Sequence, residues 1–399
     1  MTAQTLRERA PAYLAGAAAA ATPVSIAISQ ILLGAAVLAL LIERRQWRWP
    51  PVTAPILVFL GWTLLAVAAS PDWRAGMPQV KKFYVYLMIF AVFSAIRTLR
   101  EIRYVAWGWI TGGTLSALWA LQQGYQMYQA TPRFFYYVYT NQSRITGFMA
   151  HWMTFSGITM MALLMAGSMW LFDRDRRASR YTLTAIALLS IGLLAGWQRA
   201  MWAGTAVGAM RLLWTRKRAL ILLVPAFAAI ILILNPLSLR DRALSLIQPQ
   251  EGVLDSSAHR RALRAVGWEM VKAHPILGIG PEQVPKQFYA YAPPSVPNPV
   301  PSEWSTQHLH NVYYQYAAER GLPALAAMLW FLLKALCDFA KARTSRPDAR
   351  WVAEGAIACI LGIMVAGYGE VNLGDSEVLG MFLSVVACGY AAIRASQEP

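Results

Sequence analysis

Residues 147–171 read GFMAHWMTFSGITMMALLMAGSMWL, and this stretch contains no Asp, Glu, Lys or Arg. About 20 residues of apolar helix cross the hydrocarbon core of a bilayer, so the stretch is long enough to span a membrane. A basic connection with Arg174, Arg176, Arg177 and Arg180 follows it. The same alternation of apolar stretch and basic connection recurs along the chain. It predicts an all-α polytopic membrane protein, because a helix satisfies its own backbone in lipid.

The composition of the 399-residue chain agrees with this fold class. Hydrophobic residues make up 57% of the chain and charged residues only 14%, whereas a soluble domain has roughly 25% charged residues. A soluble enzyme, a disulfide-rich secreted scaffold and a disordered protein are therefore excluded. In a membrane protein, cytoplasmic loops collect Lys and Arg, and this accounts for much of the net charge of +16. We therefore expect no nucleic acid as a partner.

About twelve apolar spans account for the chain. They cover residues 11–22, 24–42, 52–69, 80–96, 104–122, 147–171, 181–196, 200–214, 219–236, 322–337, 352–370 and 377–393. Every even-numbered connection is short and basic, which assigns it to the cytoplasm by the positive-inside rule. The cations of these five connections, after spans 2, 4, 6, 8 and 10, are Arg44, Arg45, Arg48, Arg97, Arg100, Arg103, Arg174, Arg176, Arg177, Arg180, Arg216, Lys217, Arg218, Lys341, Arg343, Arg346 and Arg350. We therefore expect both termini to be cytoplasmic.

One outer connection is much larger than the others. It divides the chain into spans 1–9 (residues 1–236), a loop (residues 237–321) and spans 10–12 with the C-terminus (residues 322–399). Apolar spacing predicts a helix over Ser257–Ala273, a proline-rich segment follows, and a second helical stretch is expected to begin near Leu309. Only this outer loop is large enough to build an extramembrane site.

Several cations lie on the outer side, where the positive-inside rule should deplete them, and an anion is the natural partner of such a residue. Arg199 stands in a very short outer turn flanked by Trp197 and Trp202. Its guanidinium either extends to the membrane surface as part of an aromatic belt or grips a phosphate through two parallel hydrogen bonds. In the large loop, Arg260 and Arg264 share a helix face.

Together with Arg261, these loop arginines favour a polyphosphate site over a solvated basic face. Two histidines, His308 and His310, stand in the same loop. Their spacing and the lack of further ligands argue against zinc, so we expect no metal and no cofactor. A histidine just before a helix suits general-base catalysis instead, because imidazole is largely neutral at pH 7.

At these motifs the chain resembles the O-antigen ligase and polymerase superfamily of bacterial inner membranes. The resemblance rests on Arg199, on Arg260 followed by Trp268-Glu269-Met270 and His274-Pro275-Ile276-Leu277-Gly278-Ile279-Gly280, and on His310-Asn311 leading to Glu319-Arg320-Gly321-Leu322-Pro323. Gln198 stands where the family often has a serine before the arginine.

The resemblance implies a membrane-embedded glycosyltransferase (GT-C-like) that needs no metal and inverts the anomeric carbon. Its donor would be a glycan on undecaprenyl diphosphate, and its acceptor the outer-core sugar of lipid A–core, in the Gram-negative inner membrane with the site facing the periplasm. Arg199 and Arg260 would neutralise the departing diphosphate, and His310 would be the base. Donor or acceptor phosphates would also contact Lys81, Arg261, Arg264, His308, Asn311 and Tyr314.

Two other functions fit parts of the pattern. An O-antigen polymerase would use the same donor with a lipid-diphosphate-linked acceptor, and the motifs separate it only weakly from a ligase. A transporter of a lipid-linked anion would need paired charges buried within the spans. The candidates for such pairs are Arg211, Lys334, Glu354 and Glu370. Which loop arginine carries the main role, and which histidine is the base, stay open at this point.

Overall fold

A computed structural model describes residues 3–43, 47–135, 138–139, 143–173, 179–235, 239–240, 256–302, 304–342 and 347–395. Within these ranges all regular structure is helical. The predicted cytoplasmic cations Arg44, Arg45, Arg174, Arg176, Arg177, Arg343 and Arg346 lie outside the described residues.

The α-helices are α1 (Ala3–Ala20), α2 (Ile26–Ile42), α3 (Thr53–Ala68), α4 (Trp73–Lys81), α5 (Leu87–Ala95), α6 (Leu99–Ala130), α8 (Trp152–Phe172), α9 (Ser179–Ala195), α10 (Arg199–Arg216), α11 (Leu223–Leu234), α13 (Ser256–Ala273), α14 (Val284–Gln287), α15 (Val312–Ala342), α16 (Arg350–Ala366) and α17 (Ser376–Ala395). Short 3₁₀ helices are η1 (Lys82–Tyr86), η3 (Arg218–Leu222), η5 (Phe288–Tyr291) and η6 (Asn372–Gly374).

The apolar helices identify a membrane protein. Three of them, α8, α15 and α17, are long and apolar enough to cross a bilayer, and shorter apolar helices cover Ile26–Ile42, Thr53–Ala68, Arg180–Ala195 and Arg218–Leu234. Helical segments overlap each of the twelve predicted spans, although the fourth is divided by η1 and the helix predicted near Leu309 begins at Val312. The number of membrane crossings stays a prediction.

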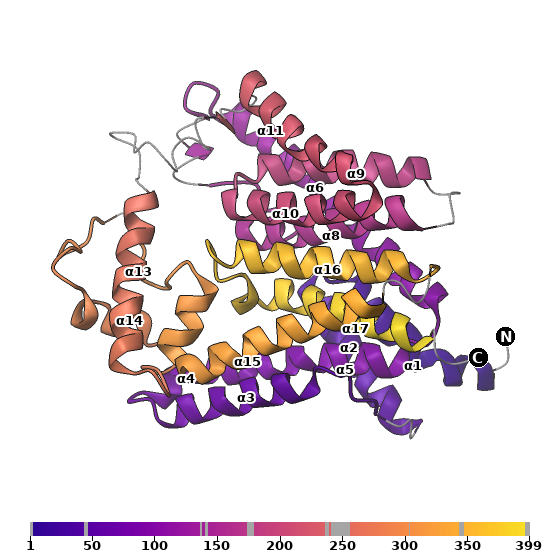
Figure 1. Cartoon of the computed structure of the whole chain (residues 1–399), viewed down its shortest axis with the longest axis horizontal. Coiled ribbons are helices and arrows are strands. Elements are labelled where there is room, and N and C mark those ends of the chain that lie inside the picture. The colour runs from indigo at the N-terminus through magenta and orange to yellow at the C-terminus, as the bar shows by residue number, and fades with distance from the viewer. Residues whose placement is uncertain are drawn as a thin grey trace.

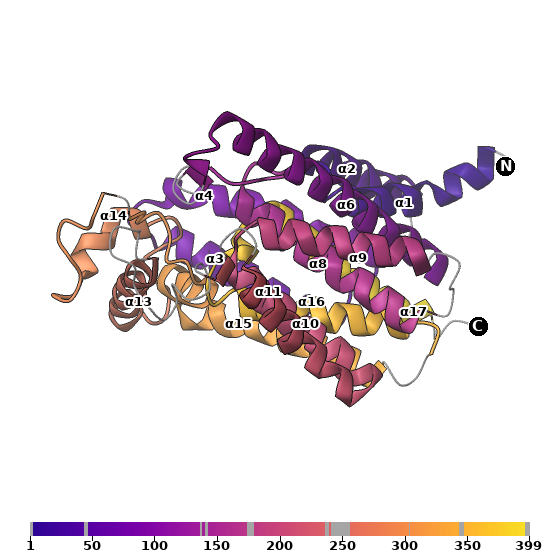
Figure 2. The same cartoon turned by 90° about the horizontal axis from the view of Figure 1, so that it is seen from above.

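The helices form an elongated bundle with α13 and α14 at one end (Figure 1). Helix α1 begins and α17 ends at the opposite end, and a view from above gives the same arrangement (Figure 2). Helices α8, α16 and α17 are buried along most of their length. In contrast, α11 has no buried residue, as expected of an apolar helix at the lipid-facing edge of a bundle.

Glycines bring α10 and α16 into close contact. A Cβ added to Gly204 would lie 2.4 Å from the carbonyl oxygen of Gly362, and one added to Gly208 would lie 2.9 Å from that of Ala358. Small residues allow helices in lipid to approach this closely. The contact fixes the start of α10, which carries Arg199, beside the chain that leaves α16.

The large loop has a small core of its own. Leu263, Val266 and Met270 of α13 are buried with Phe288 and Leu309, against the beginning of α15. Helix α13 thus buries one face on the loop, as its predicted apolar spacing requires. This second core gives the described part of the loop from residue 256 onward a defined structure next to the bundle.

The turn at residues 275–279 of the loop is hydrogen-bonded to α15 beside the kink at Gly321. Gly321 has φ 83° inside α15, and a Cβ there would lie 1.9 Å from the Ile276 carbonyl oxygen. The backbone N–H groups of Ile279 and Leu322 donate across the contact to Ala318 and Pro275, each at 2.8 Å. The His-Pro-x-x-Gly-x-Gly and Glu-Arg-Gly motifs are therefore packing partners, and only glycine fits at this approach.

Candidate functional site

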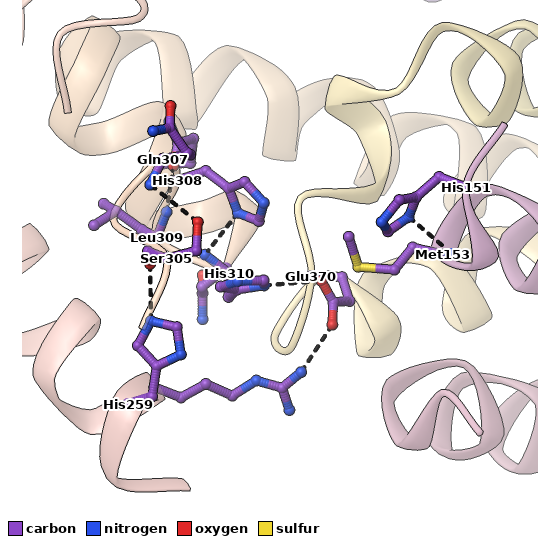
Figure 3. A network of polar contacts seen from close by, with 12 residues as sticks. His151, Met153, His259, Ser305, Gln307, His308, Leu309, His310 and Glu370 are labelled. Atoms are coloured by element: carbon purple, nitrogen blue, oxygen red, sulfur yellow. Dashed lines mark hydrogen bonds and ion pairs between the residues drawn. The ribbon is translucent and has the colours of Figure 1, made fainter. Parts of the chain in front are cut away.

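Glu370, in the connection between α16 and α17, joins residues from distant parts of the chain. Its Oε2 accepts a hydrogen bond from Nδ1 of His310 at 3.1 Å, and its Oε1 accepts one from Nη2 of Arg260 at 2.8 Å. Figure 3 shows the carboxylate reaching toward the His310 ring, with His151 on its other side. A loop histidine and a loop arginine thus meet on one buried carboxylate.

The electrostatics of this contact determine which nitrogen of His310 carries a proton. Burial opposes ionisation of Glu370, but the hydrogen bond from His310 and the nearby positive charges lower the pKa of Glu370 below its usual value. An ionised carboxylate can only accept hydrogen bonds, so Nδ1 of His310 must hold the proton. The opposite nitrogen, Nε2, then has a lone pair with which it can take a proton from a ligand.

Local backbone structure fixes the position of His310. Its φ of 48° lies in the left-handed region, which is uncommon for a residue with a side chain. The next residue, Asn311, is buried, and its Oδ1 accepts from the backbone N–H groups of Tyr313 and Tyr314, both at 3.0 Å. This is the bonding of a helix N-cap. Its Nδ2 donates to the Tyr368 carbonyl at 2.9 Å.

His308 lies beside His310 in a different electrostatic setting. The two rings are 4.0 Å apart between centroids, and the His308 Nδ1 accepts from the His310 backbone N–H at 3.3 Å. Burial, reinforced by His310, lowers the pKa of His308 from 6.5 to about 4. His308 is thus a neutral acceptor that supports the loop, whereas His310 has the carboxylate partner.

We expect His308 to make stability depend on pH. Its folded pKa of about 4 lies below its usual 6.5, so between these values the unfolded chain binds a proton that the folded protein excludes. The stability contributed by neutral His308 is fully present above about pH 6.5 and is lost as the pH falls toward 4. In His308→Asn, which keeps an acceptor, the melting temperature in detergent should therefore fall less over this window than in the wild type. Parallel curves would contradict this assignment.

The three loop arginines occupy different surroundings. Arg260 is held by Glu370, and the Arg264 guanidinium lies 5.6 Å from the centroid of the Tyr368 ring. Both face the connection after α16, in agreement with their shared helix face. Arg261 is exposed. Of the three, Arg260 is the one that reaches the His310–Glu370 pair.

Arg199 is buried at the first residue of α10. The next residue, Ala200, borders Gly369, where a Cβ would lie 2.9 Å from the Ala200 Cβ and 3.9 Å from Nη1 of Arg260. The start of α10 and the Arg260 guanidinium therefore flank one glycine, adjacent to Glu370. A side chain at position 369 would separate them.

A third arginine, Arg144, belongs to the same region. Its guanidinium lies over the Trp152 ring at 5.4 Å and is within electrostatic range of Glu370 and Arg260. The Gln198 amide, with its oxygen turned toward both groups, accepts from Nη1 of Arg144 at 3.0 Å and from Nε1 of Trp152 at 2.9 Å. Gln198 thus connects the Arg199 turn to Arg144.

Sequence reasoning did not single out four of these neighbours as site residues: Arg144, His151, His259 and Glu370. The His259 ring stacks on Trp304 and lies 5.7 Å from the His310 ring between centroids, and burial lowers its pKa. The sequence feature that could have indicated His259 was its position directly before Arg260. For Glu370, the sequence feature that could have indicated a site residue was a single carboxylate at the end of the predicted span 352–370.

A cavity of about 540 Å³ opens beside Glu370 and His308. Its wall includes Lys82, Arg320, His151 and several carboxylates. Lys82 donates to the Gly374 carbonyl at 2.7 Å, whereas the predicted Lys81 is exposed and is not part of the wall. Tyr314, also predicted to bind substrate, packs against the core of the large loop. Among the described residues no three His, Cys, Asp or Glu side chains are grouped as metal ligands.

Charged residues within the apolar spans form two ion pairs. Arg211 of α10 lies 3.1 Å from Glu354 in the second turn of α16, and Lys334 lies 3.0 Å from Asp338, four residues along α15. These are local ion pairs of neighbouring residues or helices. They do not form a chain of charges leading to Glu370, which lies in a connection outside α16.

Comparison with known proteins bears on the same residues. No curated protein matches the chain. Residues 184–329 match the family model described as O-antigen ligase, a range that contains Arg199, Arg260 and His310 but ends before Glu370. The match covers less than half of the chain, and over this segment the chain is similar to O-antigen ligases.

Proposed function

We propose that this protein is an O-antigen ligase. It transfers a glycan from undecaprenyl diphosphate to the outer-core sugar of lipid A–core, on the periplasmic side of the Gram-negative inner membrane. The observation that carries the proposal is Glu370 bonded to both His310 and Arg260. This contact brings a base and a diphosphate-binding cation together, which is what transfer of a sugar from a diphosphate requires.

The chemistry follows from the bonding of these groups. Nε2 of His310 removes the proton from the acceptor hydroxyl while the oxygen attacks the anomeric carbon, and Glu370 stabilises the imidazolium that forms. The bond from the anomeric carbon to the diphosphate oxygen breaks on the opposite face, so the configuration inverts. The diphosphate leaves as an anion and needs charge stabilisation rather than a general acid.

Arginines supply that stabilisation without a metal. A guanidinium has five N–H donors, so the single bond from Arg260 to Glu370 leaves donors for diphosphate oxygens. Arg199 is proposed to bind the same group from the other side of Gly369. Arg264 and Arg144 add positive charge nearby, and Arg261, which is exposed, is proposed to contact acceptor phosphates. The cavity beside Glu370 has the volume of a small-molecule site and is proposed to take the acceptor sugar.

Reconstitution tests the proposal directly. Purified protein, an undecaprenyl-diphosphate glycan and lipid A–core are combined with EDTA present, and the products are separated on a gel. We expect a ladder of glycan-bearing lipopolysaccharide at the same rate with and without EDTA. Glycan lengthening on the undecaprenyl carrier would identify a polymerase, and donor binding without either product would favour the transporter. Activity lost in EDTA and restored by Mg²⁺ would disprove the metal-free mechanism.

Glu370 is proposed as a positioning residue that acts through His310. Glu370→Gln should lower kcat by roughly 10²-fold or more, because loss of the carboxylate that orients a catalytic histidine costs up to about 10⁴-fold, while KM for the donor changes less. Glu370→Asp should recover part of kcat. Equal losses of kcat and of donor affinity in Glu370→Gln, with no recovery of kcat in Glu370→Asp, would show that the residue has only a structural role.

A further inference from the structure

A second large groove lies at the other end of the bundle from the site. It has a volume of about 750 Å³ and is formed by α1, the end of α5 and the start of α6. Helix α1 begins at the end of the bundle opposite α13 (Figure 1), which the positive-inside rule assigns to the cytoplasm. The proposed glycan transfer makes no use of this groove.

The charged part of the groove favours an anion. Arg9, Arg97 and Arg100 line it together with Glu8 and Glu101. The Glu101 carboxylate is already engaged in a capping box, because it accepts from the backbone N–H groups of Arg97 and Thr98 at 2.9 and 3.0 Å. Arg100 is oriented by its own bond from Nε to the Tyr104 hydroxyl, at 2.9 Å. These three guanidiniums line one groove and complement a phosphate.

The rest of the groove is apolar and follows the axis of α1. Ala12, Gly16 and Ala20 line it at a spacing of four residues, which places them on one helix face, and Ala17 is exposed beside them. From Glu8 to Ala20 the helix rises about 18 Å, and one leaflet of the hydrocarbon core is about 15 Å thick. The apolar surface formed by Ala12, Gly16, Ala17 and Ala20, called the apolar floor below, therefore has the length of an acyl chain in one leaflet.

Two tyrosines mark the level of the lipid headgroups. Tyr13 and Tyr104 line the groove and are 49% and 59% exposed. Exposed tyrosines collect where a membrane meets water, and here they line the same groove as the arginines and the alanines. A soluble phosphate would use the arginines but would leave the apolar floor empty.

We propose that this groove binds an anionic phospholipid of the cytoplasmic leaflet. Its phosphate lies among Arg9, Arg97 and Arg100, and one acyl chain lies along Ala12, Gly16, Ala17 and Ala20. The arginines and the apolar floor are separate features of one cavity, and a phospholipid is the ligand class that uses both. Basic pockets between helices on the cytoplasmic side bind such headgroups in other membrane proteins.

The test is lipid binding to the full-length protein in neutral detergent, measured by native mass spectrometry during titration with phosphatidylglycerol. Arg97→Gln/Arg100→Gln should weaken binding roughly 10- to 30-fold, from the loss of two charges near a lipid headgroup. The matched control, Arg216→Gln/Lys217→Gln, removes two exposed cations from another predicted cytoplasmic connection. It should bind like the wild type.

Two further arms separate the acyl chain from the phosphate. Ala17→Phe keeps every charge but fills the floor, so it should also weaken phosphatidylglycerol binding, by at least about threefold. Inorganic phosphate at millimolar concentration should not compete with the lipid. Equal losses in the two double variants, full competition by phosphate, or unchanged binding in Ala17→Phe would each overturn the proposal. Phosphatidylcholine binding as tight as phosphatidylglycerol would overturn it as well.

Discussion

His310→Ala should abolish glycan transfer, with a loss of roughly 10³-fold or more in kcat. A positioned general base contributes about 10²- to 10⁴-fold, and His310 is the described histidine whose Nδ1 is bonded to an ionised carboxylate, Glu370. The acceptor hydroxyl would then have no group to take its proton as it attacks. The measurement is the rate of lipopolysaccharide formation in the reconstituted assay.

The matched control for His310→Ala is His308→Asn. His308 is the neighbouring ring, 4.0 Å away between centroids, and asparagine keeps an acceptor for the His310 backbone N–H. We expect this variant to keep activity within about tenfold of the wild type. Donor binding and the melting temperature of His310→Ala should stay close to wild-type values. A loss in His308→Asn as large as in His310→Ala would move the base to His308.

Arg260→Ala should lower kcat/KM about 10²- to 10³-fold, the usual effect of removing one donor that stabilises developing negative charge. Two consequences combine in this variant. The leaving diphosphate loses a cation, and the buried Glu370 carboxylate loses the partner at 2.8 Å. Arg260→Lys should recover little, because an ammonium cannot hold both a carboxylate and a diphosphate as a planar guanidinium does.

The adjacent Arg261 provides the control for Arg260. It has the same chemistry one residue along α13, but its side chain is exposed, so Arg261→Ala should change kcat/KM less than about threefold for a donor-limited reaction. Arg199→Ala should resemble Arg260→Ala in its effect on donor binding. Equal activities for the Arg260 and Arg261 variants would refute the assignment of Arg260 to the diphosphate.

The sequence alone predicts most of the helical layout for a simple physical reason. Lipid contains no water to satisfy a backbone, so each span must be a continuous apolar helix that can be found by composition. The helix over residues 256–273 also follows from local spacing, because α13 buries one face on the loop. The helix expected near Leu309 begins instead at Val312. The Asn311 side chain caps its first turn by accepting from the backbone N–H groups of Tyr313 and Tyr314.

The sequence by itself determined an all-helical membrane protein and pointed to Arg199, Arg260 and His310 as candidate site residues, because apolar length and charge position are local properties of the chain. Only the tertiary structure decided how these residues act together. Glu370 stands 60 residues from His310 and 110 from Arg260 in the chain, and no spacing rule links them. The start of α15 is bonded to the connection that carries the carboxylate, because the Val312 N–H donates to the Gly367 carbonyl at 2.8 Å and Asn311 Nδ2 donates to the Tyr368 carbonyl at 2.9 Å. The contact with Glu370 distinguishes Arg260 from Arg261, and His310 from His308.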